Sequence, residues 1–254
     1  MQDLFAGIDI GASATKAVLI NSKKDVVGFS VLPSGINLKI ARDTVFKNAS
    51  KDLEPVNIKG LVTTGFGRKI SELKDKTKTE ISCHAKGCFH NFPIACTIVD
   101  IGGQDTKIIR LNSEGKIIGF KMNRKCAAGT GTFLEEIARR MDVPLDKIDS
   151  LARNSKKKIK LNSFCTVFSS TEILTRIREG ESKEDMINGA FEAVVQRVLE
   201  MDPLNGDVVM TGGVVAYNKI VVEILEKQLG KKIHVPPRPQ FTGALGAALY
   251  ALDM

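Results

Sequence analysis

Apolar stretches alternate with short clusters of glycine and small polar residues along the first part of the chain. One apolar run ends in Asp9-Ile10-Gly11, a second follows the small-residue turn at residues 11–15, and a third segment follows the turn at Asn21-Ser22. Runs of this length between turn residues predict three β-strands. A helical pattern near residues 38–50 then leads to an apolar strand at residues 60–64, which ends in Gly65.

The same order returns 91 residues later. Residues 6–31 and 97–122 align without a gap and are identical at 9 of 26 positions, and many of the other positions in the strands exchange one apolar residue for another. In both copies an apolar strand ends in Asp-Ile-Gly and is followed by a small-residue turn, a second strand, an Asn-Ser turn and a third strand. A strand at residues 207–211, followed by Gly212, is the counterpart of residues 60–64. The sequence therefore predicts a duplicated α/β unit.

The duplication sets the expected domain organisation. One half covers residues 1–94 and the other residues 95–241, with the boundary near Pro93. The second half is longer because of an insert at about residues 126–206, which holds a predicted helix at 131–141, a basic loop and an amphipathic helix at 185–199. A helix of small residues at 242–254 is expected to return to the first half. A chain of 254 residues is long enough to bury a core in each half.

Composition and charge narrow the class of protein. Hydrophobic residues make up 43% and charged residues 26%, as in ordinary soluble proteins. The longest apolar stretch, residues 243–252, is too short to span a membrane, and the N-terminus has no secretory pattern, so we expect a cytoplasmic protein. The net charge of +8 favours an acidic partner. Nucleic acid is not favoured, because no aromatic residues interleave the lysine clusters.

The two glycine-containing hairpins are typical of phosphate binding. Each offers backbone N–H groups that a phosphate chain can accept, and each follows an aspartate, Asp9 or Asp100, at the position where Mg²⁺ would bind. A single such hairpin is usually only a turn. However, a turn has no need to keep Asp, Gly, Thr and Lys in both copies, whereas a nucleotide does. A third loop, Thr211-Gly212-Gly213, would allow the backbone to approach a ribose or adenine, so we predict a nucleotide site.

Two of the five cysteines lie before predicted helices. Cys126 precedes the helix at 131–141, whose N-terminal N–H groups and neighbouring Arg124 and Lys125 would stabilise a thiolate, and a thiolate is a good ligand for iron. Cys165 follows 39 residues later. The alternative for either residue is a buried, unreactive thiol.

The remaining cysteines leave a second metal hypothesis open. Cys83, Cys88 and Cys96 are accompanied by His84 and His90 and could suggest zinc. They lack the paired close spacing of a structural zinc site, which favours packing roles.

The order of the three loops resembles that of the actin, sugar-kinase and heat-shock-ATPase superfamily. This resemblance implies an α/β fold of duplicated ribonuclease-H-like subdomains with ATP and Mg²⁺ in the cleft between them. Within the superfamily, the segment Cys126-Ala-Ala-Gly-Thr-Gly131 and the downstream Cys165-Thr-Val-Phe168 resemble the activator ATPases (component A) of 2-hydroxyacyl-CoA dehydratases and their relatives in benzoyl-CoA reductase and double-cubane-cluster systems.

The family resemblance implies a function. It implies an anaerobic homodimeric ATPase that takes one electron from ferredoxin or flavodoxin and transfers it at low potential to a larger iron–sulfur dehydratase or reductase. One [4Fe-4S] cluster would be shared by the dimer. Such a cluster needs four thiolates, so Cys126 and Cys165 of both chains would complete it.

The resemblance and the hairpins together give candidate site residues. The catalytic candidates are Asp9, which would hold Mg²⁺ with Asp100, and Gln104 or Asp105, which would position the attacking water. The residues expected to bind ATP or ADP are Gly11, Ala12, Ser13, Ala14, Thr15, Lys16, Asp100, Gly102, Gly103, Thr211, Gly212, Gly213 and Gln240.

Two other functions remain as alternatives. A small-molecule kinase of the sugar-kinase type would need an acidic base directed at a substrate hydroxyl, and the insert offers cysteines instead. A nucleotide-gated scaffold of the actin type would have no use for two thiols in these positions.

Overall fold

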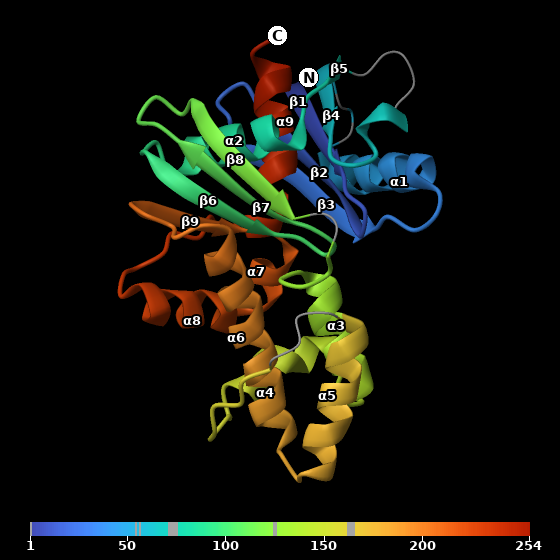
Figure 1. Cartoon of the computed structure of the whole chain (residues 1–254). Coiled ribbons are helices and arrows are strands. Elements are labelled where there is room, and N and C mark those ends of the chain that lie inside the picture. Colours follow the sequence, from blue (N-terminus) through green and yellow to red (C-terminus); the bar gives the residue numbers. More distant parts are fainter. Residues whose placement is uncertain (1, 54, 56, 71–75, 124–125, 162–165) are drawn as a thin grey trace. The chain divides into compact units, whose positions relative to one another are not determined.

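The computed structural model describes residues 2–53, 55, 57–70, 76–123, 126–161 and 166–254. Its strands are β1 (Asp3–Ile10), β2 (Ala14–Asn21), β3 (Val26–Pro33), β4 (Asn57–Thr64), β5 (Lys76–Thr77), β6 (Cys96–Ile101), β7 (Thr106–Leu111), β8 (Ile117–Asn123) and β9 (Asp207–Thr211) (Figure 1). Its α-helices are α1 (Leu38–Ser50), α2 (Glu80–Asn91), α3 (Gly131–Arg140), α4 (Ile148–Ala152), α5 (Thr166–Arg178), α6 (Lys183–Met201), α7 (Gly213–Tyr217), α8 (Lys219–Leu229) and α9 (Thr242–Leu252).

The chain divides into two compact units. The first consists of Met1–Cys96, Ile109–Gly119 and Gln240–Met254, and the second of Thr97–Ile108 and Phe120–Pro239. The residues of β6, β7 and β8 are therefore divided between the units. The strands form two sheets, in the orders β3-β2-β1-β4-β5 and β8-β7-β6-β9.

The five-stranded sheet of the first unit is covered on both faces. β1 pairs antiparallel with β2 and parallel with β4. On β2, Ala17 and Leu19 pack toward α1, whereas Val18 and Ile20 pack against α9. Burial on both faces explains why β2 has four consecutive apolar residues, Ala17–Ile20, rather than apolar residues at alternate positions.

Helix α9 is the final element of the first unit and lies against both β1 and α2. Glycine permits this close approach. A Cβ atom at Gly7 of β1 would overlap the backbone of Ala244, and one at Gly246 of α9 would overlap the backbone of Cys83 in α2. The small side chains of α9 therefore allow the C-terminal helix to lie directly on the sheet.

The core of the second unit is formed mainly by helices. Phe133 and Ile137 of α3 and Phe191 and Val194 of α6 are buried in one cluster. The helices predicted at residues 131–141 and 185–199 are confirmed as α3 and α6. Helix α6 begins earlier than predicted because the Ser182 side chain accepts a hydrogen bond from the backbone N–H of Asp185 and caps the helix.

The duplication is visible in the local geometry of the second turn. The Asn21 side-chain oxygen accepts hydrogen bonds from the amides two and four residues further along the chain, both at 2.9 Å. The Asn112 oxygen does the same, at 3.0 and 2.8 Å. The repeated Asn-Ser turn predicted from the sequence is therefore confirmed.

In the part of the chain that the structure describes, no helix has both the length and the apolar character needed to cross a membrane.

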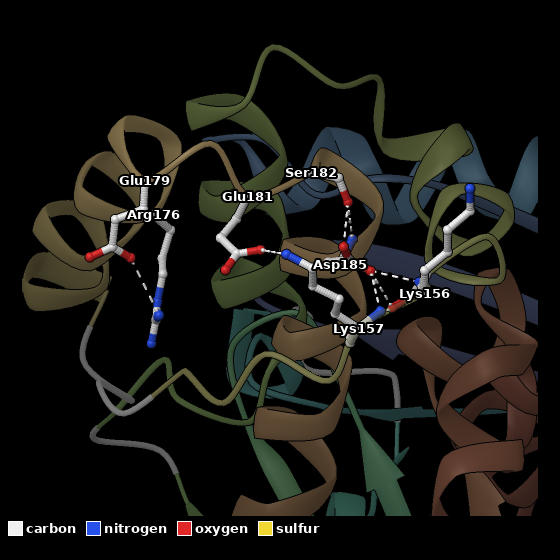
Figure 2. Close-up of polar contacts among 8 residues, drawn as sticks. Lys156, Lys157, Arg176, Glu179, Glu181, Ser182 and Asp185 are labelled. Atoms are coloured by element: carbon white, nitrogen blue, oxygen red, sulfur yellow. Dashed lines mark hydrogen bonds and ion pairs between the residues drawn. The ribbon is translucent and has the colours of Figure 1, made fainter.

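A buried carboxylate fixes the basic loop of the second unit. One Asp185 oxygen accepts hydrogen bonds from Ser155 Oγ at 2.9 Å and from the backbone N–H groups of Lys156 and Lys157 at 2.7 and 2.8 Å. The other accepts from Ser182 Oγ at 2.7 Å (Figure 2). These bonds, first among them that from the Lys157 N–H, hold the pKa of the Asp185 carboxyl well below its usual range.

We predict that Asp185→Asn lowers the thermal stability at pH 7. Because the folded pKa is lowered, the contribution of Asp185 is present above the usual carboxyl pKa of about 4 and is lost as the pH falls through the lowered value. The difference in Tm between wild type and variant should therefore shrink below about pH 4. Thermal denaturation against pH measures this, with Glu184→Gln as the control. A difference that is the same at every pH would contradict the role assigned to the carboxylate.

Candidate nucleotide site and cysteine segment

The first predicted hairpin joins β1 to β2 in the first unit. The Gly11 N–H donates to the Ala14 carbonyl at 3.1 Å. Ser34 holds the turn from outside: its N–H donates to the Ser13 carbonyl at 3.0 Å, and its hydroxyl donates to the Gly11 carbonyl at 2.6 Å. The Thr15 hydroxyl lies 2.8 Å from that of Ser34. The sequence did not single out Ser34, because it lies outside the repeated segment.

Asp9 is paired with a lysine of its own hairpin. The Lys16 Nζ lies 3.3 Å from Asp9 Oδ2, and the carboxylate is buried. Lys16 was expected to bind the nucleotide. In the first unit, the Lys16 ammonium instead lies against Asp9, the predicted Mg²⁺ ligand.

The second hairpin repeats this arrangement and adds to it. The Gly102 N–H donates to the Asp105 carbonyl at 2.9 Å, in the position of the Gly11 bond. Lys107 Nζ lies 3.2 Å from Asp100 Oδ2 and 2.7 Å from Asp105 Oδ1. Thr211 Oγ1 donates to the other Asp100 oxygen at 2.9 Å. Two predicted residues, Asp100 and Asp105, therefore contact Lys107, and a third, Thr211, contacts Asp100. Lys107 was absent from the candidates although it is one of the identical positions of the repeat.

The remaining nucleotide candidates lie at hairpin tips and in the third loop. Ala12, Ser13 and Gln104 are exposed. Gly212 precedes α7 with a φ of 103°, and its N–H donates to the carbonyl of Pro239, the residue before Gln240.

Cys126 differs from the other cysteines that the structure describes. It is partly exposed, whereas Cys83, Cys88 and Cys96 are buried. The side chain of Asn123 donates to the Cys126 and Ala128 carbonyls at 3.0 Å each, which fixes the segment around the thiol. Cys165, Arg124 and Lys125 lie outside the described residues.

The cysteine segment is hydrogen-bonded directly to the second hairpin. The first N–H groups of α3, those of Gly131 and Thr132, donate to the carbonyls of Gly102 and Gly103 at 2.9 and 2.7 Å. The Thr132 hydroxyl also donates to the Gly103 carbonyl, at 2.6 Å. In return, Thr106 Oγ1 donates to the Gly129 carbonyl at 2.6 Å. We call these four hydrogen bonds the hairpin–helix joint.

The joint corrects one expectation from the sequence. The N-terminal N–H groups of this helix were expected to be available to the Cys126 thiolate. That expectation is wrong for Gly131 and Thr132, because their N–H groups already donate to the hairpin. N–H groups in the first turn of a helix have no partner within the helix, and the hairpin carbonyls supply one.

The oxygen donors fit Mg²⁺, which typically keeps several water ligands and takes one or two carboxylates together with phosphates. Asp9 and Asp100 supply such carboxylates. Among the described residues, no group of three or more His, Cys, Asp or Glu could enclose a metal ion. Burial raises the pKa of the Cys83 thiol to about 12, so this residue is protonated at neutral pH and is a poor zinc ligand.

Comparison with known proteins covers nearly the whole chain. Residues 6–251 match the profile of the BadF/BadG/BcrA/BcrD ATPase family. The chain belongs to this ATPase family.

Several members of the ATPase family are closely similar over their full length. The activator of lactoyl-CoA dehydratase from Anaerotignum propionicum is 42% identical over 97% of this chain and 96% of its own. The (R)-2-hydroxyglutaryl-CoA dehydratase activating ATPase from Acidaminococcus fermentans is 39% identical, over 96% and 95%. The structure of the activator of the 2-hydroxyisocaproyl-CoA dehydratase from Clostridium difficile with bound ADPNP superposes with a TM-score of 0.91 and 36% identity, covering 98% of this chain and 94% of that one. The predicted actin-like ATPase fold is therefore confirmed.

We predict that Gly212→Ala weakens both folding and nucleotide binding. A Cβ at this position would overlap the Ile101 backbone, and the φ of 103° is itself unfavourable for alanine. Gly206→Ala is the matched control, because Gly206 also has a positive φ, 73°, but has no atom within 4 Å of the added Cβ. The control should cost about 1–2 kcal/mol of unfolding free energy, and Gly212→Ala at least ~1 kcal/mol more. Denaturant unfolding and fluorescent-ADP binding measure both effects. Equal losses in the two variants would contradict this account of the third loop.

Proposed function

We propose that this ATPase activates a 2-hydroxyacyl-CoA dehydratase or a related reductase by one-electron transfer driven by ATP hydrolysis. The electron would come from ferredoxin or flavodoxin and pass through one [4Fe-4S] cluster shared by two copies of the chain in the cytoplasm. The activator role is supported by two relatives that match this chain over nearly their whole length, the activator of lactoyl-CoA dehydratase and the (R)-2-hydroxyglutaryl-CoA dehydratase activating ATPase. The two halves inferred from the duplication, residues 1–94 and 95–241, would be the moving parts.

The observation that supports this function best is the hairpin–helix joint. It connects the Gly102 and Gly103 backbone, expected at the phosphates, to the Gly129–Thr132 backbone, just after Cys126. A displacement of the hairpin would be transmitted through these hydrogen bonds of 2.6–2.9 Å rather than through a flexible linker. A kinase would have no use for a thiol attached in this way.

Different residues of the chain would bind the phosphates, bind Mg²⁺ and position the attacking water. The exposed hairpin tips offer backbone N–H groups to phosphates, and Thr211 and Lys107 hold Asp100 in place. Asp9 and Asp100 would bind Mg²⁺, which would neutralise phosphate charge. Gln104, exposed at its tip, and Asp105 are the candidates for positioning water.

Cys126 is suited to a shared cluster by its exposure and its fixed backbone. A partly exposed thiol can reach a ligand that a second copy also contacts. Cys165 is proposed as its companion. The iron–sulfur cluster would supply the one-electron redox chemistry, and the two cysteines would supply half of its four thiolates from each chain.

We predict that Cys126→Ser removes both the iron and most of the dimer. The serine oxygen is a poor replacement for a thiolate ligand, and a shared cluster links the two copies. Anaerobically purified wild type should be brown and contain about four iron atoms per dimer. Iron analysis and size-exclusion chromatography measure the outcome, with Cys83→Ser as the buried control that should keep its iron. Wild-type iron content in Cys126→Ser would show that this residue is not a ligand.

We predict that the wild type releases phosphate from ATP with no acceptor substrate present. Asp9→Asn and Gln104→Ala should each lower this turnover by at least ~10²-fold, the usual scale for losing a positioned catalytic group, and should leave the absorbance of the cluster unchanged. A phosphate-release assay with and without added sugars distinguishes the two functions. Strict dependence on an acceptor would favour the kinase alternative.

A further inference from the structure

The two hairpins differ in one charged residue. Each has a lysine against the aspartate that ends the preceding strand, at 3.3 Å for Lys16 and Asp9 and at 3.2 Å for Lys107 and Asp100. At the position of Ala14 in the first hairpin, the second hairpin has Asp105. The duplication therefore kept one ion pair in both copies and placed an extra carboxylate in only one.

The extra carboxylate is tightly bound. Asp105 Oδ1 lies 2.7 Å from Lys107 Nζ, closer than the lysine lies to Asp100. The Lys107 side chain is only 5% exposed, whereas that of Asp105 is 23% exposed. A Cβ at position 102 would lie 3.0 Å from the same Asp105 oxygen, so glycine there leaves room for the carboxylate.

The charge balance differs accordingly. In the first hairpin one ammonium faces one carboxylate. In the second hairpin one buried ammonium lies against two carboxylates. Asp105 is the more exposed of the two carboxylates, and a carboxylate within hydrogen-bond reach of a bound water can accept a proton from it.

We infer that Lys107 is a positioning residue that acts through Asp105 in ATP hydrolysis. The inference rests on the proposed nucleotide site. In the step, the water oxygen forms a bond to the γ-phosphorus and the bond between that phosphorus and the β–γ bridging oxygen breaks. Its electron pair leaves with ADP, and a proton of the water passes to the Asp105 carboxylate. Lys107 holds that carboxylate by one oxygen. Asp100 in turn holds Lys107, and Thr211 holds Asp100.

The duplication also supplies a conservative variant. Asp105→Ala gives the second hairpin the residue that the first hairpin already has, and the Gly102 N–H to backbone carbonyl bond can remain, as at Gly11 and Ala14. Lys107 keeps its pair with Asp100. This variant should therefore fold.

A double-mutant cycle tests the inference. Phosphate release by the full chain is measured without an electron donor or partner enzyme for wild type, Asp105→Ala, Lys107→Met and the double variant. Asp105→Ala should lower kcat by ~10²–10⁴-fold with a nearly unchanged KM for ATP. Lys107→Met should lower kcat as well, and the double variant should be no slower than Asp105→Ala alone. Losses that multiply in the double variant, or a wild-type kcat in either single variant, would overturn the inference.

Lys107→Arg separates positioning from charge balance if the methionine variant does not fold. Arginine keeps the positive charge but presents it as a planar fork, so it cannot hold the Asp105 oxygen in the same place. We expect a lowered kcat with wild-type thermal stability and wild-type affinity for fluorescent ADP. A wild-type kcat in Lys107→Arg would show that Lys107 supplies only a positive charge, and it would overturn the inference. All these measurements remain interpretable if the protein proves to carry no cluster, because wild-type hydrolysis alone provides the reference.

Discussion

The structure of the second unit depends on a helix whose first N–H groups bind the backbone of a loop. The amides of Gly131 and Thr132 need acceptors, because no helical turn precedes them. The carbonyls of Gly102 and Gly103 provide these acceptors, and hydroxyls of Thr132 and Thr106 add two short bonds. Breaking the joint would leave buried polar groups without partners, so the hairpin and the helix are expected to move together.

In the proposed function, this constraint would connect the nucleotide-binding hairpin to the Cys126 thiol. The hairpin tip is exposed, and Cys126 is partly exposed, but the backbone between them is fixed by Asn123, Thr106 and Thr132. If the hairpin moved on hydrolysis, the cysteine segment would move with it, because no flexible linker separates the two. Coupling of this kind needs an element with two discrete positions rather than a continuous deformation.

The repeat shows what each hairpin requires and what only one of them uses. Both have a glycine N–H bonded to the carbonyl three residues later, and both pair a buried aspartate with a lysine. The outer support differs, because the first turn is held by Ser34 and the second by the start of α3. The first hairpin is therefore anchored within its own sheet, and the second is anchored to the segment that carries the cysteine.

Much of the fold could be predicted from the sequence, because strand runs, repeated turns and amphipathic helices are local patterns. The presence of α3 and α6 and the repeated Asn turn were predicted in this way, although α6 begins two residues earlier than predicted. The hydrogen-bond and ion-pair partners of individual side chains were harder to predict from the sequence. Lys107 could have been noticed as an identical position, yet nothing in its neighbours revealed that it bridges two carboxylates. The hydrogen bonds from the Gly131 and Thr132 amides to the hairpin could not be inferred from the sequence, because they join segments about 30 residues apart.

The most direct test of the joint is hydrogen–deuterium exchange of the full chain in ADP and in an ATP analogue. If the hairpin–helix joint transmits the nucleotide state, peptides that cover residues 102–106 and 126–132 should change their exchange together, with the largest effect at the amides of Gly131 and Thr132. Peptides from α8 serve as the internal reference and should remain unchanged. A change confined to residues 102–106, with the cysteine segment exchanging equally in both states, would contradict the account.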